Sequence, residues 1–427
     1  MSAPVPKLVF LLDTPNIRRG RALAGTPARV LALAEHSSRS GADVTMMLCD
    51  RGADYGTEVD WPFDVALVHP TDFYNPTALA GVAARRGADF LVLCEAEALV
   101  AMGRRLAGML DARLVYDMHD DDAEVAETVG ESPTTVERHA KTQGAALENA
   151  DAVIVSTRNE ASLAAAGGVP ASRTALLPNG ADPRRAFYWG PDADASTLVF
   201  VGNLYYRPNA AAVEAICDTI LPSVRAEGVD VRARIIGRGP ASLTRSDRDI
   251  EFTGRVDTVS EAFEATTLAL APLTAGSGAK MKVLDYLAAG LPVLGTDQAV
   301  TGLPNCHPGV LVEDDLHLWP MRIAALLRDP ALLELMGQAG RRCVEGELCW
   351  PQIGAELVRH CRSWLASVPS QAREVVDETD AGAPRWLAEH SQQDALGEPE
   401  SSRPSQPRWL CPRTPQSQEG TDGFTTA

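Results

Sequence analysis

Short apolar runs alternate with amphipathic stretches along the N-terminal part of the chain. Residues 7–12 (KLVFLL) form the first apolar run, and a second run (VTMMLC) follows Gly41. The segment between these runs spaces its apolar residues three and four apart, which is the period of a helix. The same succession continues through four further runs, in FDVALVHP, ADFLVLCE, ARLVYDMHD and DAVIVST. Strands that are apolar throughout and separated by helices predict a parallel sheet covered on both faces.

A second series of the same kind begins after a stretch rich in Pro, Gly and Asp. That stretch has no hydrophobic period, and we assign residues 181–195 as a linker. Six apolar runs follow, in STLVFVGN, VRARIIGRG, IEFTGRV, TLALAPL, PVLGTD and GVLVED, and helices near 316–327, 330–345 and 350–367 close the series. We therefore predict an α/β fold of two Rossmann-like parallel-sheet domains, at residues 1–180 and 196–368, that face each other across a cleft.

The composition changes at Pro369. Residues 369–427 are rich in Pro, Ser, Gln and Glu and offer few apolar groups to bury, so we predict that this tail is disordered. Two copies of PRWL, at 384–387 and 407–410, leave open the alternative of a docking element within the tail.

The charge balance of the chain narrows the classes of partner. With 39 Lys and Arg against 57 Asp and Glu, the formal net charge is −18, which disfavours binding to nucleic acid or to an anionic membrane. No apolar run is long enough for a membrane anchor and the N-terminus lacks the pattern of a signal peptide, so we expect a cytoplasmic protein. Eight Cys without any CxxC pair predict free buried thiols rather than zinc ligands or disulfides.

The candidate chemistry gathers in residues 272–297. There a loop of small residues, with Gly276, Ser277 and Gly278 at its centre, leads directly into a predicted helix, whose first N–H groups form an anion site. Lys280 and Lys282 follow within the first turn, although the whole chain contains only four Lys. Positive side chains disfavour a helix start unless an anion compensates them. We interpret the pair as a diphosphate site, and the alternative is a solvated helix start.

Asp285 lies three residues beyond Lys282 and hence on the same face of that helix. Its carboxylate could accept hydrogen bonds from both hydroxyls of a ribose. The alternative is an ion pair between Asp285 and Lys282.

These motifs resemble a known family. FVGNLYYRPN (200–209), IIGRGP (235–240), FTGRV (252–256) and above all residues 272–303 are similar, in order and spacing, to the donor-binding half of the family 4 retaining glycosyltransferases of GT-B fold. PNGAD at 178–182 resembles the interdomain segment of that family, and VYDMHD resembles the strand end that carries a His. The resemblance covers about residues 5 to 367.

The resemblance implies roles for individual residues. Gly202 would let the backbone approach the donor phosphates, and Arg207 or Lys282, with Lys280 beside it, would bind the diphosphate. His119 would lie over the transferred sugar. Asp285 would take the place of the second Glu of the E-x7-E motif and hold the ribose.

Ser277 stands where the first Glu of that motif belongs, as in branches of the family with a GxGxxxK loop. We expect it to contact the sugar through its hydroxyl and backbone, between Gly276 and Gly278. Asp120, Asp121 and Asp122 could hold a divalent metal. We interpret them instead as capping and solvated residues, and expect neither an essential metal nor a cofactor.

The resemblance further implies transfer with retention, in which the leaving diphosphate takes the proton of the acceptor while Lys282 and Arg207 stabilise its charge. We expect a nucleotide-diphosphate sugar as donor, a UDP-sugar and specifically UDP-N-acetylglucosamine, and a small polar acceptor, which the basic residues Arg18, Arg19 and Arg21 could contact. The chain looks like the transferases that glycosylate 2-deoxystreptamine in aminoglycoside antibiotic biosynthesis.

Several alternatives remain. These are polysaccharide biosynthesis, a nucleotide-sugar epimerase of the same fold and a non-catalytic sugar-nucleotide-binding module. A dinucleotide-dependent enzyme is disfavoured, because the nearest match to GxGxxG, at 237–242, has Pro240 where a helix must start.

Overall fold

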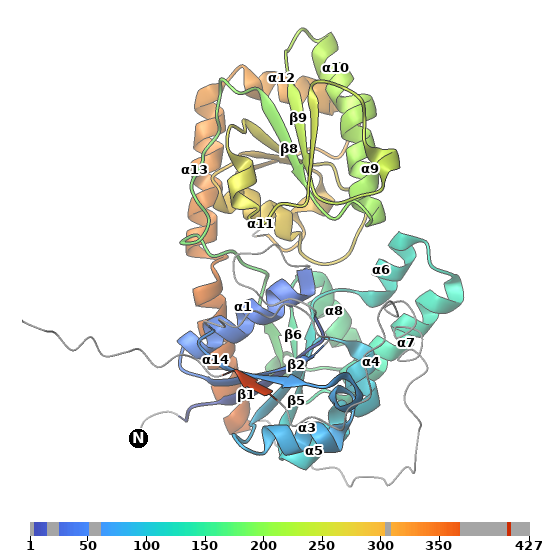
Figure 1. The fold of residues 1–427 in the computed structure, drawn as a ribbon, viewed down its shortest axis with the longest axis vertical. Coiled ribbons are helices and arrows are strands. Elements are labelled where there is room, and N and C mark those ends of the chain that lie inside the picture. The colour runs from blue at the N-terminus through green and yellow to red at the C-terminus, as the bar shows by residue number, and fades with distance from the viewer. Residues whose placement is uncertain (1–3, 15–24, 51–60, 304–308, 368–407, 411–427) are drawn as a thin grey trace, which may run out of the picture.

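Two α/β units lie one above the other in the computed structural model (Figure 1), which describes residues 4–14, 25–50, 61–303, 309–367 and 408–410. Each unit is a parallel sheet with helices on both faces. The predicted α/β fold of two Rossmann-like parallel-sheet domains is confirmed.

The N-terminal sheet has seven parallel strands in the order β3-β2-β1-β4-β5-β6-β7. Their bounds are β1 Lys7–Leu12, β2 Asp43–Cys49, β3 Asp64–Val68, β4 Phe90–Leu93, β5 Arg113–Met118, β6 Ala152–Val155 and β7 Thr174–Leu176. The helices are α1 Gly25–Arg39, α2 Pro70–Phe73, α3 Pro76–Ala83, α4 Ala96–Ala98, α5 Arg104–Leu110, α6 Asp122–Val129, α7 Pro133–Asn149 and α8 Arg158–Ala166. Two separate apolar cores fill the opposite faces of this sheet, as expected for strands without hydrophobic alternation.

The C-terminal sheet has six parallel strands in the order β10-β9-β8-β11-β12-β13. Their bounds are β8 Thr197–Val201, β9 Arg232–Ile236, β10 Ile250–Gly254, β11 Leu268–Ala271, β12 Val293–Gly295 and β13 Val310–Val312. The helices are α9 Arg207–Ala215, α10 Leu221–Ala226, α11 Met281–Ala288, α12 Trp319–Leu327, α13 Pro330–Gly346 and α14 Trp350–Ser367.

The strand order reverses between β1 and β4 in one sheet and between β8 and β11 in the other. Open α/β sheets bind ligands beyond the carboxyl ends of the strands at such a reversal. The loops that follow these strands therefore mark where a ligand is expected.

The last helix, α14, crosses back from the C-terminal unit and packs on the N-terminal one, mainly against α1 (Figure 1). Its buried residues belong to the core beneath the N-terminal sheet: Trp350, Ile353, Leu357, Val358, Cys361 and Trp364. From the sequence this helix is assigned to the C-terminal unit, because periodicity shows that a helix has an apolar face but not which sheet that face packs against.

The close approach of α14 depends on two glycines. A Cβ on Gly354 would lie 2.5 Å from the backbone carbonyl carbon of His36 in α1, and a Cβ on Gly180 would lie 2.7 Å from Ile353. Gly180 belongs to the PNG segment (178–180), where the chain first passes from the N-terminal to the C-terminal unit. It packs directly against the start of α14, where the chain passes back.

Other expectations concern the cysteines and the tail. Six Cys in the described ranges are buried thiols outside any disulfide, as predicted, whereas Cys306 and Cys411 lie outside those ranges. Most of the tail predicted to be disordered also lies outside them, but Arg408–Leu410 form strand β14, which pairs antiparallel with β3. No strand is predicted there from the sequence, but the strand lies in the second PRWL motif, for which the sequence leaves a docking element open. Among the described residues, no helix combines the length and the apolar character needed to cross a membrane.

Two glycine-to-alanine substitutions test the packing of α14. Alanine favours a helix interior over glycine by about 1 kcal/mol. Gly144 in α7 has open space where a Cβ would go, so Gly144→Ala should raise the unfolding temperature slightly. Gly354→Ala should instead lower stability by roughly 1 to 3 kcal/mol, because α14 must move away from α1. Thermal unfolding of both variants decides the point, and equal stabilisation by both would contradict the packing.

Candidate functional site

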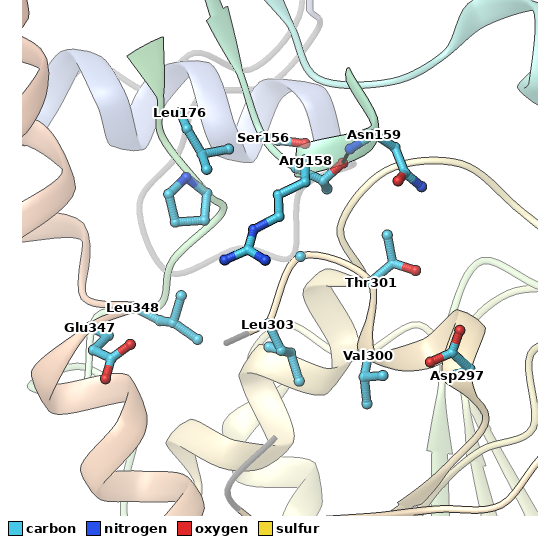
Figure 2. Close-up of a pocket in the computed structure, with 13 residues that line it drawn as sticks. Ser156, Arg158, Asn159, Leu176, Asp297, Val300, Thr301, Leu303, Glu347 and Leu348 are labelled. Carbon is cyan, nitrogen blue, oxygen red and sulfur yellow. Dashed lines mark hydrogen bonds between the residues drawn. The ribbon is translucent and has the colours of Figure 1, made fainter. Parts of the chain in front are cut away.

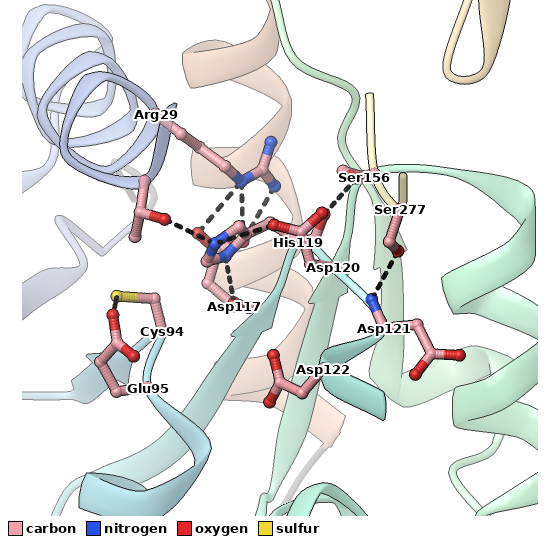
Figure 3. Close-up of polar contacts among 12 residues, drawn as sticks. Arg29, Cys94, Glu95, Asp117, His119, Asp120, Asp121, Asp122, Ser156 and Ser277 are labelled. Carbon is pink, nitrogen blue, oxygen red and sulfur yellow. Dashed lines mark hydrogen bonds and ion pairs between the residues drawn. The ribbon is translucent and has the colours of Figure 1, made fainter. Parts of the chain in front are cut away.

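The two units touch where the loop after β5 meets the loop after β11. The hydroxyl of Ser277 accepts a hydrogen bond from the backbone N–H of Asp121 at 2.9 Å (Figure 3). A Cβ on Gly278 would lie 2.0 Å from the Asp120 carboxylate and 2.9 Å from the carbonyl oxygen of His119, and its φ of +67° also favours glycine. The predicted glycine loop is therefore in direct contact with the segment that carries His119.

A buried ion pair fixes the end of β5, from which the His119 segment follows. The Arg29 guanidinium in α1 donates to both carboxylate oxygens of Asp117 at 2.8 to 3.1 Å, and both side chains are 1% exposed. Arg29 also donates to the side-chain oxygen of Asn179 at 2.8 Å and to the carbonyl of Leu177 at 3.1 Å. One guanidinium thus joins α1, the end of β5 and the PNG segment. Arg29 is not among the residues predicted from the sequence, although a single Arg within the apolar face of a helix is a usable signal for a buried partner.

His119 lies at the end of β5, two residues after Asp117, and is half-buried at the cleft. Its Nδ1 is 3.2 Å from the carbonyl oxygen of Asp117, which can only accept, so Nδ1 carries a hydrogen. Nε2 is 2.9 Å from the Thr26 hydroxyl and 3.7 Å from the Asp120 carboxylate. The imidazole is therefore fixed in orientation by α1 and by its own strand end.

Acidic side chains gather beside His119 on the β4 side (Figure 3). Desolvation, reinforced by the negative charges of Glu97 and Glu95, raises the pKa of Asp122 to about 7. Desolvation also raises the pKa of Glu95. The charges of Glu97 and Asp13 add to this increase, whereas His119 reduces it. These carboxylates repel one another, so a positively charged group placed among them would be stabilised.

The three consecutive aspartates play different parts. Asp121 caps α6, because its carboxylate accepts from the N–H groups of Ala123 and Glu124, as expected. Asp120 and Asp122 are half-buried rather than solvated, because the glycine loop and the β4 loop cover them, and desolvation raises the pKa of Asp120 as well. Within the described ranges, no three His, Cys, Asp or Glu side chains group as metal ligands.

The Lys280 side chain folds back onto the glycine loop and stabilises it. Its ammonium donates to the carbonyl oxygens of Gly276, Ser277 and Gly278 at 2.9, 2.6 and 2.7 Å. Desolvation lowers the pKa of Lys280 to about 8. The amino group is thus occupied by the loop that it follows and fixes the shape of that loop.

Lys282 and Asp285 lie on one face of α11, and no ion pair joins them. The Lys282 ammonium instead donates to the side-chain oxygen of Asn209 at 2.5 Å and lies 4.2 Å from the centre of the Phe200 ring. Desolvation, followed by repulsion from Lys280, lowers the pKa of Lys282 to about 7. Desolvation raises the pKa of Asp285 to about 7, and its carboxylate has no hydrogen-bond partner among the described residues. The i, i+3 ion pair considered above is therefore not formed.

Gly202 and Arg207 flank the start of α9. A Cβ on Gly202 would lie 2.9 Å from the Asn209 amide, so Gly202, Asn209 and Lys282 form one contiguous group. Arg207 points elsewhere: its Nη1 would lie 2.9 Å from a Cβ on Gly130, at the end of α6 in the other unit. The structure brings together all the predicted donor residues of the C-terminal unit except Arg207. The basic residues Arg18, Arg19 and Arg21 lie outside the described ranges.

A cavity of about 680 Å³ opens between the units on the β6 side of the loop contact (Figure 2). The Arg158 side chain, at the start of α8, extends into it (Figure 2). Thr301 and Leu303 line the opposite wall, and Glu347 closes one end. None of the site residues predicted from the sequence lines this cavity.

Two family models match the chain in succession. A glycosyl transferase 4-like domain matches residues 24–180, and a domain described as glycosyl transferases group 1 matches residues 195–329. No curated protein sequence is significantly similar to the chain.

Solved structures share the two-domain fold. Sucrose-phosphate synthase from Thermosynechococcus elongatus is 18% identical, with 84% of this chain and 99% of that chain covered and a TM-score of 0.65. HepE from Anabaena, in complex with UDP-glucose, is 14% identical, with 84% and 99% covered and a TM-score of 0.61. A TarM variant from S. aureus, in complex with UDP and α-GlcNAc-glycerol, is 12% identical, with 67% and 59% covered and a TM-score of 0.52.

Gly278→Ala tests the contact between the units. Because a Cβ there would meet the Asp120 carboxylate, the variant should hold the units apart and increase the radius of gyration measured by small-angle X-ray scattering. Gly108→Ala in α5, where a Cβ meets nothing within 4 Å, is the matched control and should leave the scattering unchanged. Identical scattering from wild type and Gly278→Ala would contradict the contact.

Proposed function

This chain is a glycosyltransferase of GT-B type, with a group 1 C-terminal domain and a glycosyl transferase 4-like N-terminal domain, and we propose that it transfers a sugar with retention from a UDP-sugar to a small amine-bearing acceptor. The observation that carries the proposal is the pair of uncompensated groups on α11. The Lys282 ammonium contacts the neutral Asn209 side chain and the Phe200 ring, and desolvation shifts the pKa values of both Lys282 and Asp285. A nucleotide diphosphate would supply an anion for Lys282 and ribose hydroxyls for Asp285.

The donor diphosphate would bind at Lys282. The first N–H groups of α11 lie beside it, and Lys280, the residue before that helix, offers no side-chain cap to them. A phosphate oxygen would accept from these donors and from the ammonium. Gly202 leaves room for the backbone to approach, and Asp285 would accept from the ribose hydroxyls. Arg207 would join the site only if its side chain left Gly130.

A UDP-sugar is the best-supported donor. The structures of HepE contain UDP and UDP-glucose, and that of TarM contains UDP and α-GlcNAc-glycerol. We propose UDP-N-acetylglucosamine. Ser277 and Gly278 would lie against the sugar ring, since their loop faces His119 across the cleft.

The acceptor side favours an amine. Glu95 and Asp122 have raised pKa values beside His119, and a cationic amine placed among them would lower the cost of ionising both. An aminocyclitol of the kind found in aminoglycoside antibiotics matches this chemistry. A neutral polysaccharide acceptor would leave the repulsion uncompensated.

In the proposed reaction the bond between the anomeric carbon and the diphosphate oxygen breaks. The acceptor oxygen forms its bond to the same face of that carbon, and its proton passes to the leaving diphosphate. Lys282 and the α11 N-terminus stabilise the charge that develops on the diphosphate. His119 would orient the sugar or the attacking hydroxyl. These groups supply the positive charge, so the reaction needs neither a cofactor nor an essential metal.

We place this reaction in the cytoplasm, where nucleotide sugars are available. The six buried Cys of the described residues are thiols rather than disulfides, which is consistent with a reducing compartment.

Donor turnover tests the proposal directly. The purified protein is incubated with UDP-, GDP- and dTDP-sugars, with aminocyclitol or simple sugar acceptors or with none, in the presence of EDTA, and products are followed by mass. We expect UDP and a glycosylated aminocyclitol. An altered sugar without any acceptor would indicate an epimerase, and donor binding without turnover would indicate a binding module.

Lys282→Ala should lower kcat/KM at least a hundredfold, because a charge-assisted hydrogen bond to the developing charge is worth roughly 3 kcal/mol. Lys141→Ala, on the exposed face of α7, is the control and should leave turnover unchanged. Activity of Lys282→Ala within about twofold of wild type would refute the assignment of the diphosphate site.

The pH dependence of donor binding follows from the lowered pKa of Lys282. The ammonium is charged below pH 7 and loses its proton above it, so the diphosphate then binds only with uptake of a proton. The Kd for UDP-glucose should rise roughly tenfold between pH 7 and pH 8.5. Lys282→Arg keeps its charge throughout and should flatten this dependence, whereas Asp285→Asn should preserve it. A flat profile in wild type would contradict the titration of Lys282.

A further inference from the structure

The outer edge of the N-terminal sheet is covered by a segment from the far end of the chain. Strand β14 (the red strand in Figure 1) pairs antiparallel with β3. Arg408 lies opposite Leu67, Trp409 opposite Ala66 and Leu410 opposite Val65. Every other pairing in this sheet is parallel.

An uncovered β3 would be a template for association. Its apolar residues, Val65 to Val68, are at most 2% exposed, so the strand is buried on both faces. A bare edge of this kind presents unpaired N–H and C=O groups to any extended chain, including the same edge of a second copy.

The sequence around β14 is suited to ending a sheet. The strand has three residues, Pro407 immediately precedes it and Pro412 follows two residues after it. Proline has no N–H to donate, and short edge strands with proline are a common means by which proteins prevent further pairing. The covered edge is therefore a poorer template than β3 alone.

The tether between α14 and β14 allows the pairing within one chain. The 40 residues 368–407 join Ser367 to Arg408. Fully extended, a chain of that length reaches about 130 Å, so the number of residues does not prevent the pairing. Because both segments belong to one chain, the pairing needs no second molecule, which compensates for the weakness of a three-residue strand.

We propose that the C-terminal segment Arg408–Leu410 is an intramolecular guard of the β3 edge, which docks by strand addition and keeps the N-terminal sheet from pairing with a second copy of the chain. The occupant of the edge is the chain's own second PRWL motif. The first motif, at 384–387, supplies the matched control.

Amide hydrogen exchange on the full-length chain tests this proposal. Trp409→Pro/Leu410→Pro removes two consecutive N–H groups, one of which must face β3 because the groups alternate in direction along a strand. Exchange of the β3 amides should accelerate at least tenfold, and light scattering should show concentration-dependent self-association. The control Trp386→Pro/Leu387→Pro should match wild type in both measurements. A synthetic peptide spanning 407–412 should restore protection and the monomer mass to the first variant.

Three results would overturn the proposal. Unchanged β3 exchange in Trp409→Pro/Leu410→Pro would mean that the tail does not guard the edge. Equal loss of protection in the control variant would mean that the two motifs are not distinguished. Wild-type protection that falls on dilution would mean that the strand comes from a second copy instead.

Discussion

The buried ion pair between Arg29 and Asp117 is the interaction on which the site depends. Removing one partner of such a pair leaves an uncompensated charge and costs about 3 to 5 kcal/mol. Here the loss of the pair would disturb the position of His119 as well as lower stability. The backbone carbonyl of Asp117 accepts from Nδ1 of His119, which follows the end of β5. Arg29 lies one helical turn from Thr26, whose hydroxyl contacts the imidazole. The same guanidinium donates a hydrogen bond to Asn179 of the PNG segment. The next residue, Gly180, lacks the Cβ that would collide with α14.

Charge is compensated unevenly around the cleft. Lys280 is satisfied by three carbonyl groups and shapes the glycine loop, whereas Lys282 and Asp285 remain uncompensated on the next turns of the chain. Across the cleft, Glu95 and Asp122 repel each other beside His119. The C-terminal wall thus favours an anion and the N-terminal wall a cation. This polarity matches the diphosphate donor and the amine acceptor that we propose.

Much of the fold followed from local pattern, because strands apolar on both faces and helices between them allow few arrangements other than parallel sheets. The glycine loop and the two Lys could also be located from the sequence, because a loop, a helix start and two charges fall within a few residues. Their binding role stays a prediction. Contacts between segments that are distant in the sequence could not be predicted. The partner of Arg29, the position of Arg207 against Gly130 and the pairing of β14 with β3 arise from how separate elements pack, which no local spacing encodes. The placement of α14 on the N-terminal sheet has the same origin.

The most direct test of the central claim is a crystal structure of the chain with UDP-N-acetylglucosamine bound. The account predicts diphosphate density within hydrogen-bond distance of the Lys282 ammonium, with the ribose hydroxyls on Asp285 and the sugar between Ser277 and His119. Density for the diphosphate beside Arg158, in the cavity on the β6 side, would contradict it.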